Sequence, residues 1–367
     1  MKRRKTFMAI GGICISLILV ALLLPACSPK EDTPTTPTTP TEAEEEVFEL
    51  KWQTTSWPGH SAWELNEDTA NRIETMSNGR IQIELYEGGA IATTGDAFDA
   101  MSVGAFDFAK ICTCWIQGNV PVGNLTWGLV GGPSIWHEKR ELDFELEPRS
   151  FEDIERDAYA AHGNIYVIHL SPQVRNYGAF MSTVPINKMT DVNGLKVRSF
   201  GMTGRVWVAN GASLVTTAPG EEYTALALGT IDAANRGGPS LFYDLGLHEV
   251  CPYYVNSPLT DSNCTWCMNA DRWNELPDNL KAIVEAECLR SQILGGDDTY
   301  IKDIEKLQVM VNDWGTTVIE WPQEEFDAVR SVAIPLYEEL GEELNDPYYD
   351  EAFQLLTDYL TMRGYSW

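Results

Sequence analysis

This sequence has few basic residues for its length. Its 367 residues include 26 Lys and Arg against 54 Asp and Glu, which gives a formal net charge of −28. Four of the basic residues stand together at positions 2–5, so the rest of the chain has 22 basic residues against 54 acidic ones, a difference of −32. A surface this acidic argues against nucleic acid and anionic lipid as partners, because both are polyanions. Any site for an anion must therefore be local and basic.

Histidine is also scarce, and the signatures of common catalytic sites are missing. The sequence has no nucleophile elbow, no Ser/His/Asp spacing with supporting context and no phosphate-binding glycine loop. The five histidines are scattered without metal-ligand spacing: His60, His137, His162, His169 and His248. Only His169, at a predicted strand end, falls near the predicted cleft, and we interpret it as structural. These absences favour a binding protein, with an extracytoplasmic enzyme on a similar scaffold as the alternative.

Long apolar runs are missing except at the N-terminus. There, basic residues 2–5 precede an apolar stretch from Met8 to Leu24, which closes on Leu24-Pro25-Ala26-Cys27. The pattern indicates a lipoprotein signal peptide over residues 1–26, with Cys27 as the acylated residue. A transmembrane anchor is the alternative, although 17 residues is the lower limit for spanning a bilayer. Both interpretations place the body of the chain outside the cytoplasm, in the periplasm or on the outer face of the cytoplasmic membrane.

Residues 27–46 lack the apolar periodicity of a folded segment. They are rich in Thr, Pro and Glu, and residues 35–40 read Thr-Thr-Pro-Thr-Thr-Pro, which predicts an extended, solvated tether. The remaining residues, about 320 in number, are enough for two domains with cores of their own. We predict a first lobe from 47–172 with about 257–305, a second lobe from 173–256 with about 306–330, and C-terminal helices over 331–367.

Six cysteines remain once Cys14 and Cys27 of the N-terminal segment are set aside. They are Cys112, Cys114, Cys251, Cys264, Cys267 and Cys288. Disulfides are the default for an exported chain, and buried free thiols are the alternative in an anaerobic organism. The pairs Cys112/Cys114 and Cys264/Cys267 could supply four thiolates to zinc. No histidine lies near either pair, and we do not predict a metal there.

From residue 48 onward, strand and helix periodicities alternate. The first round predicts strands and helices in turn over 48–54, 61–77, 81–85, 97–103 and 106–111. A second round has strand patterns near 165–170, 178–182, 195–198 and 230–234. This order is typical of an α/β fold with helical crossovers, in which ligands bind at the carboxyl ends of the strands.

The last third of the sequence has a predominantly helical pattern. Residues 278–312 have a helical pattern that is broken only by Gly295-Gly296, and a continuous helix there would be on the order of 50 Å long and longer than one domain. A short strand at 318–319 and amphipathic helices over 326–362 follow it.

The most informative stretch is 190–239. It begins with Asp191-Val192-Asn193-Gly194-Leu195-Lys196-Val197-Arg198 and thus ends a short apolar strand on an arginine. Alternation along the strand puts Arg198 on the opposite face from Val197. A planar guanidinium held there can bind a carboxylate through two parallel hydrogen bonds. A surface arginine or a structural ion pair is the alternative.

The same stretch resembles the solute-binding proteins of tripartite ATP-independent periplasmic (TRAP) transporters, the DctP-type family. The matching pieces are residues 191–198, Glu222-Tyr223-Thr224-Ala225-Leu226 and Gly229-Thr230-Ile231-Asp232-Ala233-Ala234. The resemblance covers about 50–321, and Gly238-Pro239 with 245–250 is most similar to the branch that binds 2-oxo acids and related monocarboxylates. It implies a two-lobed periplasmic-binding-protein fold with a hinge and a long helix crossing both lobes. It also implies a receptor that binds a small organic anion between the lobes and delivers it to a membrane permease.

The resemblance also implies roles for individual residues. Arg198 matches the arginine that clamps the ligand carboxylate, and Arg175 or its competitor Gln173 matches a second polar contact. Trp57 and Trp115 follow first-lobe strands, where they would wall the cleft or, alternatively, pack between the lobes.

Two positions depart from the 2-oxo-acid branch, which there has a glutamate and a tryptophan that help hold a cation bridging to the ligand. This chain has Asn235 and Arg236 instead, while Asp261 matches a further acidic residue. A fixed positive charge in place of a carboxylate disfavours metal binding. We therefore expect no cofactor, with Arg236 in the role of the cation and Asn235 and Asp261 orienting it. The extra charge could equally favour a dicarboxylate.

Overall fold

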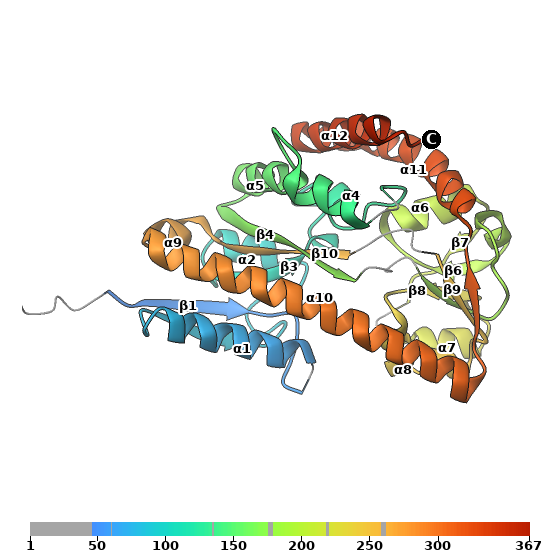
Figure 1. Ribbon diagram of the computed structural model, residues 1–367, viewed down its shortest axis with the longest axis horizontal. Coiled ribbons are helices and arrows are strands. Elements are labelled where there is room, and N and C mark those ends of the chain that lie inside the picture. Colours follow the sequence, from blue (N-terminus) through green and yellow to red (C-terminus); the bar gives the residue numbers. More distant parts are fainter. Residues whose placement is uncertain (1–45, 60, 134–135, 175–178, 218–219, 258–261) are drawn as a thin grey trace, which may run out of the picture. The chain divides into compact units, whose positions relative to one another are not determined.

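The structure is a computed structural model that describes residues 46–367 except 60, 134–135, 175–178, 218–219 and 258–261 (Figure 1). The predicted signal peptide and nearly all of the predicted tether lie outside the described residues. The described chain forms two β-sheets, each accompanied by helices, which confirms the predicted two-lobed α/β fold. The first sheet has the strand order β2-β1-β3-β10-β4 and the second the order β11-β9-β5-β8-β6-β7.

The first sheet is built from strands at both ends of the predicted first lobe. Its strands are β1 (Phe48–Gln53), β2 (Ile81–Tyr86), β3 (Phe108–Cys112), β4 (Ile165–Val174) and β10 (Ser262–Asn269). Strand β1 runs parallel to β2 and β3, and β10 is inserted antiparallel between β3 and β4. The carboxyl ends of β1, β2 and β3 therefore meet at one edge, where a ligand site is expected.

The second sheet is made of shorter strands. They are β5 (Phe180–Ser182), β6 (Lys196–Arg198), β7 (Ser213–Leu214), β8 (Ala233–Asn235), β9 (Tyr253–Asn256) and β11 (Thr317–Glu320). Strands β6 and β8 are parallel neighbours, with Arg198 opposite Ala234. The loops after β6 and β8 consequently leave the sheet side by side.

The predicted helices are present, and helices at 123–126, 136–140, 151–162, 239–244 and 270–275 were not predicted. None of the helices in the described part of the chain is long and apolar enough to cross a membrane. They are α1 (Ser61–Met76), α2 (Ala97–Ser102), α3 (Gly123–Thr126), α4 (Trp136–Arg140), α5 (Phe151–His162), α6 (Gly201–Ala209), α7 (Glu222–Ala227), α8 (Pro239–Asp244), α9 (Ala270–Glu275), α10 (Asp278–Trp314), α11 (Gln323–Leu344) and α12 (Pro347–Arg363).

Helix α10 connects the two lobes (Figure 1). It runs unbroken for 37 residues, as predicted, and packs against α1 and β4 of the first lobe and against α8 of the second. A Cβ atom added at Gly295 would lie 3.1 Å from a Leu65 methyl carbon, so glycine there allows α1 to approach closely. Farther along, the Asp303 carboxylate accepts a hydrogen bond of 2.8 Å from the Ser240 amide at the start of α8.

Three of the strands, β7, β9 and β10, were not predicted, and the predicted strand at 230–234 begins too early. All eight residues of β10 are buried, so the strand lacks the alternation that marks a half-exposed strand. The predicted strand at 230–234 begins only at Ala233. The amides of Thr230 and Ile231 instead donate to the Ala225 carbonyl at the end of α7.

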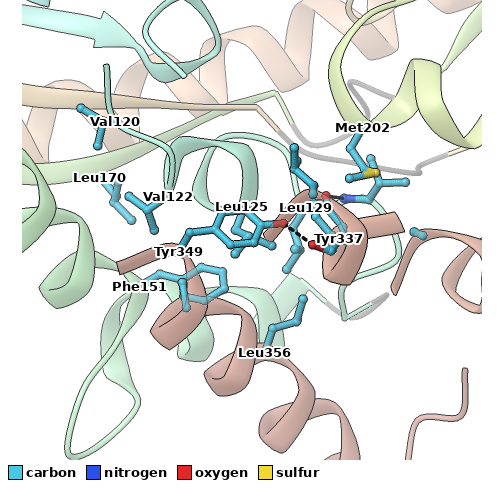
Figure 2. Close-up of a cluster of buried hydrophobic side chains, with 14 of the residues drawn as sticks. Val120, Val122, Leu125, Leu129, Phe151, Leu170, Met202, Tyr337, Tyr349 and Leu356 are labelled. Carbon is cyan, nitrogen blue, oxygen red and sulfur yellow. Dashed lines mark hydrogen bonds between the residues drawn. The ribbon is translucent and has the colours of Figure 1, made fainter. Parts of the chain in front are cut away.

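The C-terminal helices cover an apolar cluster that has residues from both lobes (Figure 2). The Tyr349 hydroxyl donates to the Tyr337 carbonyl at 2.7 Å, and the Tyr337 hydroxyl accepts from the Val130 amide at 3.0 Å. Leu125 and Leu356 are fully buried in the same cluster. Because α12 packs on α5 and α11 packs on α6, the C-terminal segment contacts both lobes.

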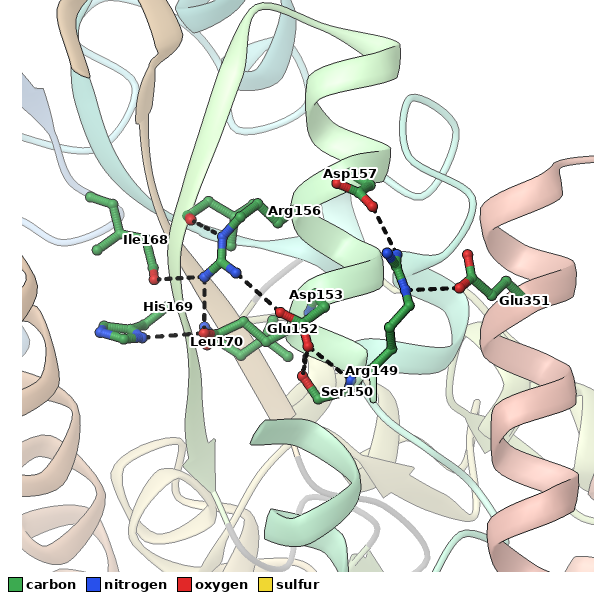
Figure 3. Close-up of polar contacts among 11 residues, drawn as sticks. Arg149, Ser150, Glu152, Asp153, Arg156, Asp157, Ile168, His169, Leu170 and Glu351 are labelled. Carbon is green, nitrogen blue, oxygen red and sulfur yellow. Dashed lines mark hydrogen bonds and ion pairs between the residues drawn. The ribbon is translucent and has the colours of Figure 1, made fainter. Parts of the chain in front are cut away.

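A polar network ties α5 to β4 (Figure 3). Arg156 donates to the Val167 carbonyl at 3.0 Å and to Glu152 at 3.0 Å, and Glu152 accepts from the Leu170 amide at 2.8 Å. The His169 Nδ1 atom lies 3.4 Å from the same Glu152 carboxylate. His169 thus has a partner within the scaffold, in line with its predicted structural role.

Glu155, also on α5, gives stability a pH dependence. It is fully buried and accepts 2.8 Å from the Thr265 hydroxyl, and burial raises its pKa from 4.5 to about 8. Between these values the folded state holds a proton that the unfolded state has lost, so stability falls as pH rises from about 4.5 to 8. We expect the unfolding free energy of the wild type to fall by roughly 3–5 kcal/mol through Glu155 as the pH rises, and Glu155→Gln to abolish this fall. Urea unfolding of both proteins at pH 5 and pH 8 measures the difference. An unchanged pH dependence in the variant would contradict this assignment.

Candidate ligand-binding site

Arg198 stands at the end of β6, where the sequence placed it. Val197 before it is fully buried in the second-lobe core, and alternation turns Arg198 to the other face, where its side chain is 13% exposed. The Nη1 atom donates to the Asn235 carbonyl oxygen at 2.6 Å, and Nη2 lies 3.6 Å from the Glu222 carboxylate. The guanidinium is therefore held in one orientation by β8 and by the start of α7.

Glu222 is the centre of the charged cluster. Its side chain is completely buried at the first turn of α7, and it accepts a hydrogen bond of 2.8 Å from the Gly220 amide. Besides Arg198, it forms a close ion pair with Arg236 Nη1. The Arg236 side chain is 22% exposed. Two guanidiniums thus converge on one buried carboxylate, and the three groups together have a formal charge of +1.

Asn235, between these arginines, is tied to the backbone. Its side-chain amide donates to the Ala179 carbonyl at 3.0 Å, and its Oδ1 atom accepts from the Ser199 hydroxyl at 3.5 Å. The side chain is buried and links the segments around β5, β6 and β8. These hydrogen bonds position the Asn235 backbone carbonyl, which accepts the hydrogen bond from Arg198.

An aromatic pair joins Arg198 to the first lobe. The Arg198 guanidinium carbon lies 5.3 Å from the ring centroid of Phe200, a distance at which a cation attracts an aromatic face. The Phe200 ring lies 5.4 Å from the Trp127 ring. Trp127 belongs to the first lobe, since its carbonyl accepts from the Asn263 amide of β10 at 2.8 Å. The candidate clamp is therefore in contact, through two rings, with the opposite lobe.

Of the other predicted ligand residues, two tryptophans are exposed, and the side chains of the rest lie outside the part of the chain that the structure describes. Trp57 follows β1 and Trp115 follows β3, and each side chain is 57% exposed. Gln173 lies in β4, but nothing is described of its side chain, and Arg175 and Asp261 lie outside the described residues.

A cavity of about 650 Å³ opens at the carboxyl ends of β1 and β3, beside α10. Thr54, Thr55 and Asn66 line it together with Lys110 and Lys302. Burial lowers the pKa of Lys110, whose ammonium lies 5.1 Å from the Trp266 ring centroid. The cavity shares no residue with the arginine cluster, so the described part of the chain holds two separate polar regions at its strand ends.

Sequence reasoning missed Glu222, Lys110 and Phe200. Glu222 was part of a segment that matches the family pattern, but it was given no role, because an acidic residue at a helix start commonly complements the helix dipole. The folded chain alone brings it between two arginines that are 38 positions apart.

Comparison with known proteins identifies the family. Residues 57–344 match the family described as "Bacterial extracellular solute-binding protein, family 7", DctP. The chain belongs to this family. Its members are extracytoplasmic receptors of TRAP transporters rather than enzymes, which confirms the predicted role and class.

Individual DctP relatives are distant in sequence and close in fold. A monocarboxylate 2-oxoacid-binding periplasmic protein of Nostoc is 24% identical over 297 residues, 79% of each chain. An open, ligand-free TRAP solute-binding protein from Rhodobacter sphaeroides superposes with a TM-score of 0.74 at 24% identity, covering 86% of this chain and 98% of that one. One from Pseudoalteromonas atlantica with bound sodium and pyruvate has a TM-score of 0.72 at 20% identity, with 87% and 95% covered.

Proposed function

We propose that this DctP receptor binds a small organic monoanion, a 2-oxo or hydroxy monocarboxylate, with Arg198 as the main contact of its carboxylate. The receptor closes its two lobes around this ligand by hinge bending and delivers it to a TRAP permease. The Nostoc relative and the pyruvate-bound Pseudoalteromonas protein support this ligand class. The match of residues 191–198 to the family pattern supports the choice of arginine.

The charge of the arginine cluster is the observation that carries the proposal. Arg198 and Arg236 bring two positive charges, and buried Glu222 neutralises one of them. One uncompensated positive charge suits one carboxylate, because a buried charge is tolerated only when it is paired. A dicarboxylate would leave one negative charge to be met elsewhere. For this reason we favour a monocarboxylate over the dicarboxylate that the sequence had left open.

The residues at 235 and 236 do not fit a bridging cation. The Asn235 amide is engaged with Ala179 and Ser199, and Arg236 presents a guanidinium where a cation would need an oxygen. No three or more His, Cys, Asp or Glu side chains among the described residues are grouped to hold a metal ion. We infer that Arg236 supplies the positive charge beside the ligand carboxylate that a cation supplies in such relatives as the sodium-bound protein.

We expect ligand binding to survive removal of metal ions. Calorimetric titration of the full-length protein with pyruvate, lactate and succinate measures both ligand class and cation dependence. The monocarboxylates should bind more tightly than succinate, and chelator in sodium-free buffer should leave their Kd within about threefold, less than 0.7 kcal/mol.

Two results would overturn parts of this proposal. A loss of affinity on removing cations would show that a metal is bound, with Asp261 as the next residue to test. Preferential binding of succinate would instead indicate a dicarboxylate receptor. Native mass spectrometry of freshly purified protein identifies a co-purified acid independently of the compounds chosen.

We also propose that Cys27 bears the lipid that anchors the receptor to its membrane. Replacing Cys27 with serine should move the protein from the membrane fraction to the soluble fraction, because the acyl chains are the anchor that remains after cleavage. Cys14→Ser, in the apolar stretch before the cleavage site, is the matched control and should remain membrane-bound. An unprocessed wild-type chain in the membrane fraction, measured by intact mass, would favour a transmembrane anchor.

A further inference from the structure

Three thiols meet where β3 ends. Cys112, the last residue of β3, has its Sγ atom 3.1 Å from Sγ of Cys114. Cys264 lies directly opposite Cys112 in the antiparallel ladder of β3 and β10. Opposed residues in such a ladder have Cα atoms about 4.5–5.5 Å apart, within the range of about 4.4–6.8 Å that a disulfide spans. Cys112 therefore has two thiols within reach of a covalent bond.

All six described cysteines are free thiols, and only Cys112 and Cys114 among them are partly exposed. Cys114 is half-buried, whereas Cys264 is buried. The interaction with Cys114 is the main cause that raises the pKa of Cys112, and the interaction with Cys112 together with burial raises the pKa of Cys264. By contrast, Cys251 is buried among apolar side chains of the second lobe. A small oxidant would reach Cys112 and Cys114 before the buried thiols, and of these two Cys112 has the raised pKa.

The Cys112 sulfur also holds the aromatic pair that leads to the candidate clamp. Trp127 is 4% exposed, and its indole N–H donates to Cys112 Sγ at 3.0 Å. The Trp127 ring lies against Phe200, whose own ring lies under the Arg198 guanidinium. A change at the sulfur can therefore act on Arg198 through two adjacent rings, from the first lobe to the second.

We propose that Cys112, Cys114 and Cys264 form a thiol–disulfide exchange site that controls ligand affinity through Trp127. The Cys114 thiolate attacks a small-molecule disulfide, forms a mixed disulfide and releases one thiolate, which takes up the proton that Cys114 lost. The Cys112 sulfur, after losing its own proton, attacks the Cys114 sulfur, and the second small thiol leaves with that proton. Two protein thiols and one disulfide thus become one protein disulfide and two small thiols. A further exchange with Cys264 moves the bond to the neighbouring strand.

Forming the disulfide draws the Cys112 sulfur to about 2.05 Å from its partner and changes the acceptor of the Trp127 N–H. The indole then loses its hydrogen-bond geometry in a buried position, and its contact with Phe200 shifts. Only this effect on affinity rests on the proposed role of Arg198. The formation of the disulfide does not.

The test uses the full-length protein with 2-hydroxyethyl disulfide, which is small and uncharged and so is not repelled by the acidic surface. Differential alkylation and peptide mapping should find one disulfide, between Cys112 and Cys114 or between Cys112 and Cys264. Cys112→Ser should abolish it, while Cys251→Ser, the buried control, should leave it unchanged. Persistence of free Cys112 under conditions that oxidise a free thiol peptide would overturn the exchange site.

Affinity for pyruvate, measured in the reduced and oxidised states, tests whether the disulfide controls ligand affinity. Oxidation should weaken binding about tenfold, and dithiothreitol should restore it. Trp127→Phe keeps a ring against Phe200 but has no N–H, so its affinity should not depend on redox state. Equal affinities of the two wild-type states would overturn the coupling to the clamp. If reduced wild type binds none of the acids tested, the proposed ligand class fails while the peptide map still decides the exchange site.

Discussion

Arg198→Ala is expected to lower affinity for the monocarboxylate ligand by about 100-fold or more, close to 3 kcal/mol. The guanidinium is fixed by the Asn235 carbonyl and by Glu222, so its orientation is set before the ligand arrives. Removing it takes away a charged, two-point hydrogen-bond partner and leaves a ligand carboxylate desolvated without compensation. Isothermal titration calorimetry with pyruvate, at fixed ionic strength, measures the loss.

Two further variants separate the clamp from a general effect of charge. Arg198→Lys keeps the charge without the planar fork and should fall between wild type and alanine. Arg205→Ala removes an arginine whose side chain is 41% exposed and pairs with Glu343 outside the cluster, so its affinity should remain that of wild type. Binding by Arg198→Ala within about threefold of wild type, under 0.7 kcal/mol, would show that Arg198 is a structural arginine.

Glu222→Gln is expected to destabilise the second lobe and to change which anions bind. The substitution keeps the shape of the side chain but leaves two neighbouring guanidiniums with no buried counter-charge. Breaking a buried pair in this way costs about 3–5 kcal/mol, measured as the free energy of urea unfolding. At the same time the charge of the cluster rises from +1 to +2, so the ratio of succinate to pyruvate affinity should increase.

Glu221→Gln is the control for Glu222→Gln. Glu221 is exposed, and its replacement changes the net charge of the protein by the same amount. It should leave both the stability and the ligand preference within error. A Glu222→Gln protein as stable as wild type, with an unchanged preference among acids, would show that the cluster does not set the charge of the ligand.

The long helix shows what can be predicted from sequence. Residues 278–314 combine helical periodicity with an absence of proline, and these local properties specify a helix whatever it packs against. Gly295 and Gly296 lower the local propensity without breaking it, and the close approach of Leu65 explains why a side chain is absent at Gly295. Length alone then indicated that this helix must extend beyond one lobe.

Strand β10 shows the opposite case. Both of its faces are covered, so its eight residues have no alternation, and its cysteines suggested cross-links or metal ligands instead of a strand. Its pairing with β3 and β4 joins segments about 90 to 160 positions apart in the sequence. Such pairing depends on which surfaces remain available after the lobes form, and no local signal encodes it.

The candidate site also has one part that local sequence predicts and another that depends on the tertiary structure. Arg198 could be chosen from the sequence because a short strand, its alternation and the motif around it are all local. What Arg198 does depends on Glu222, Arg236 and Phe200, which come from α7, from the loop after β8 and from the start of α6. The sequence by itself determined the two-lobed receptor and predicted which arginine binds the ligand. The tertiary structure decided the charge of the site and its contact with the thiols of β3, because both arise from side chains that meet only when separate elements pack together.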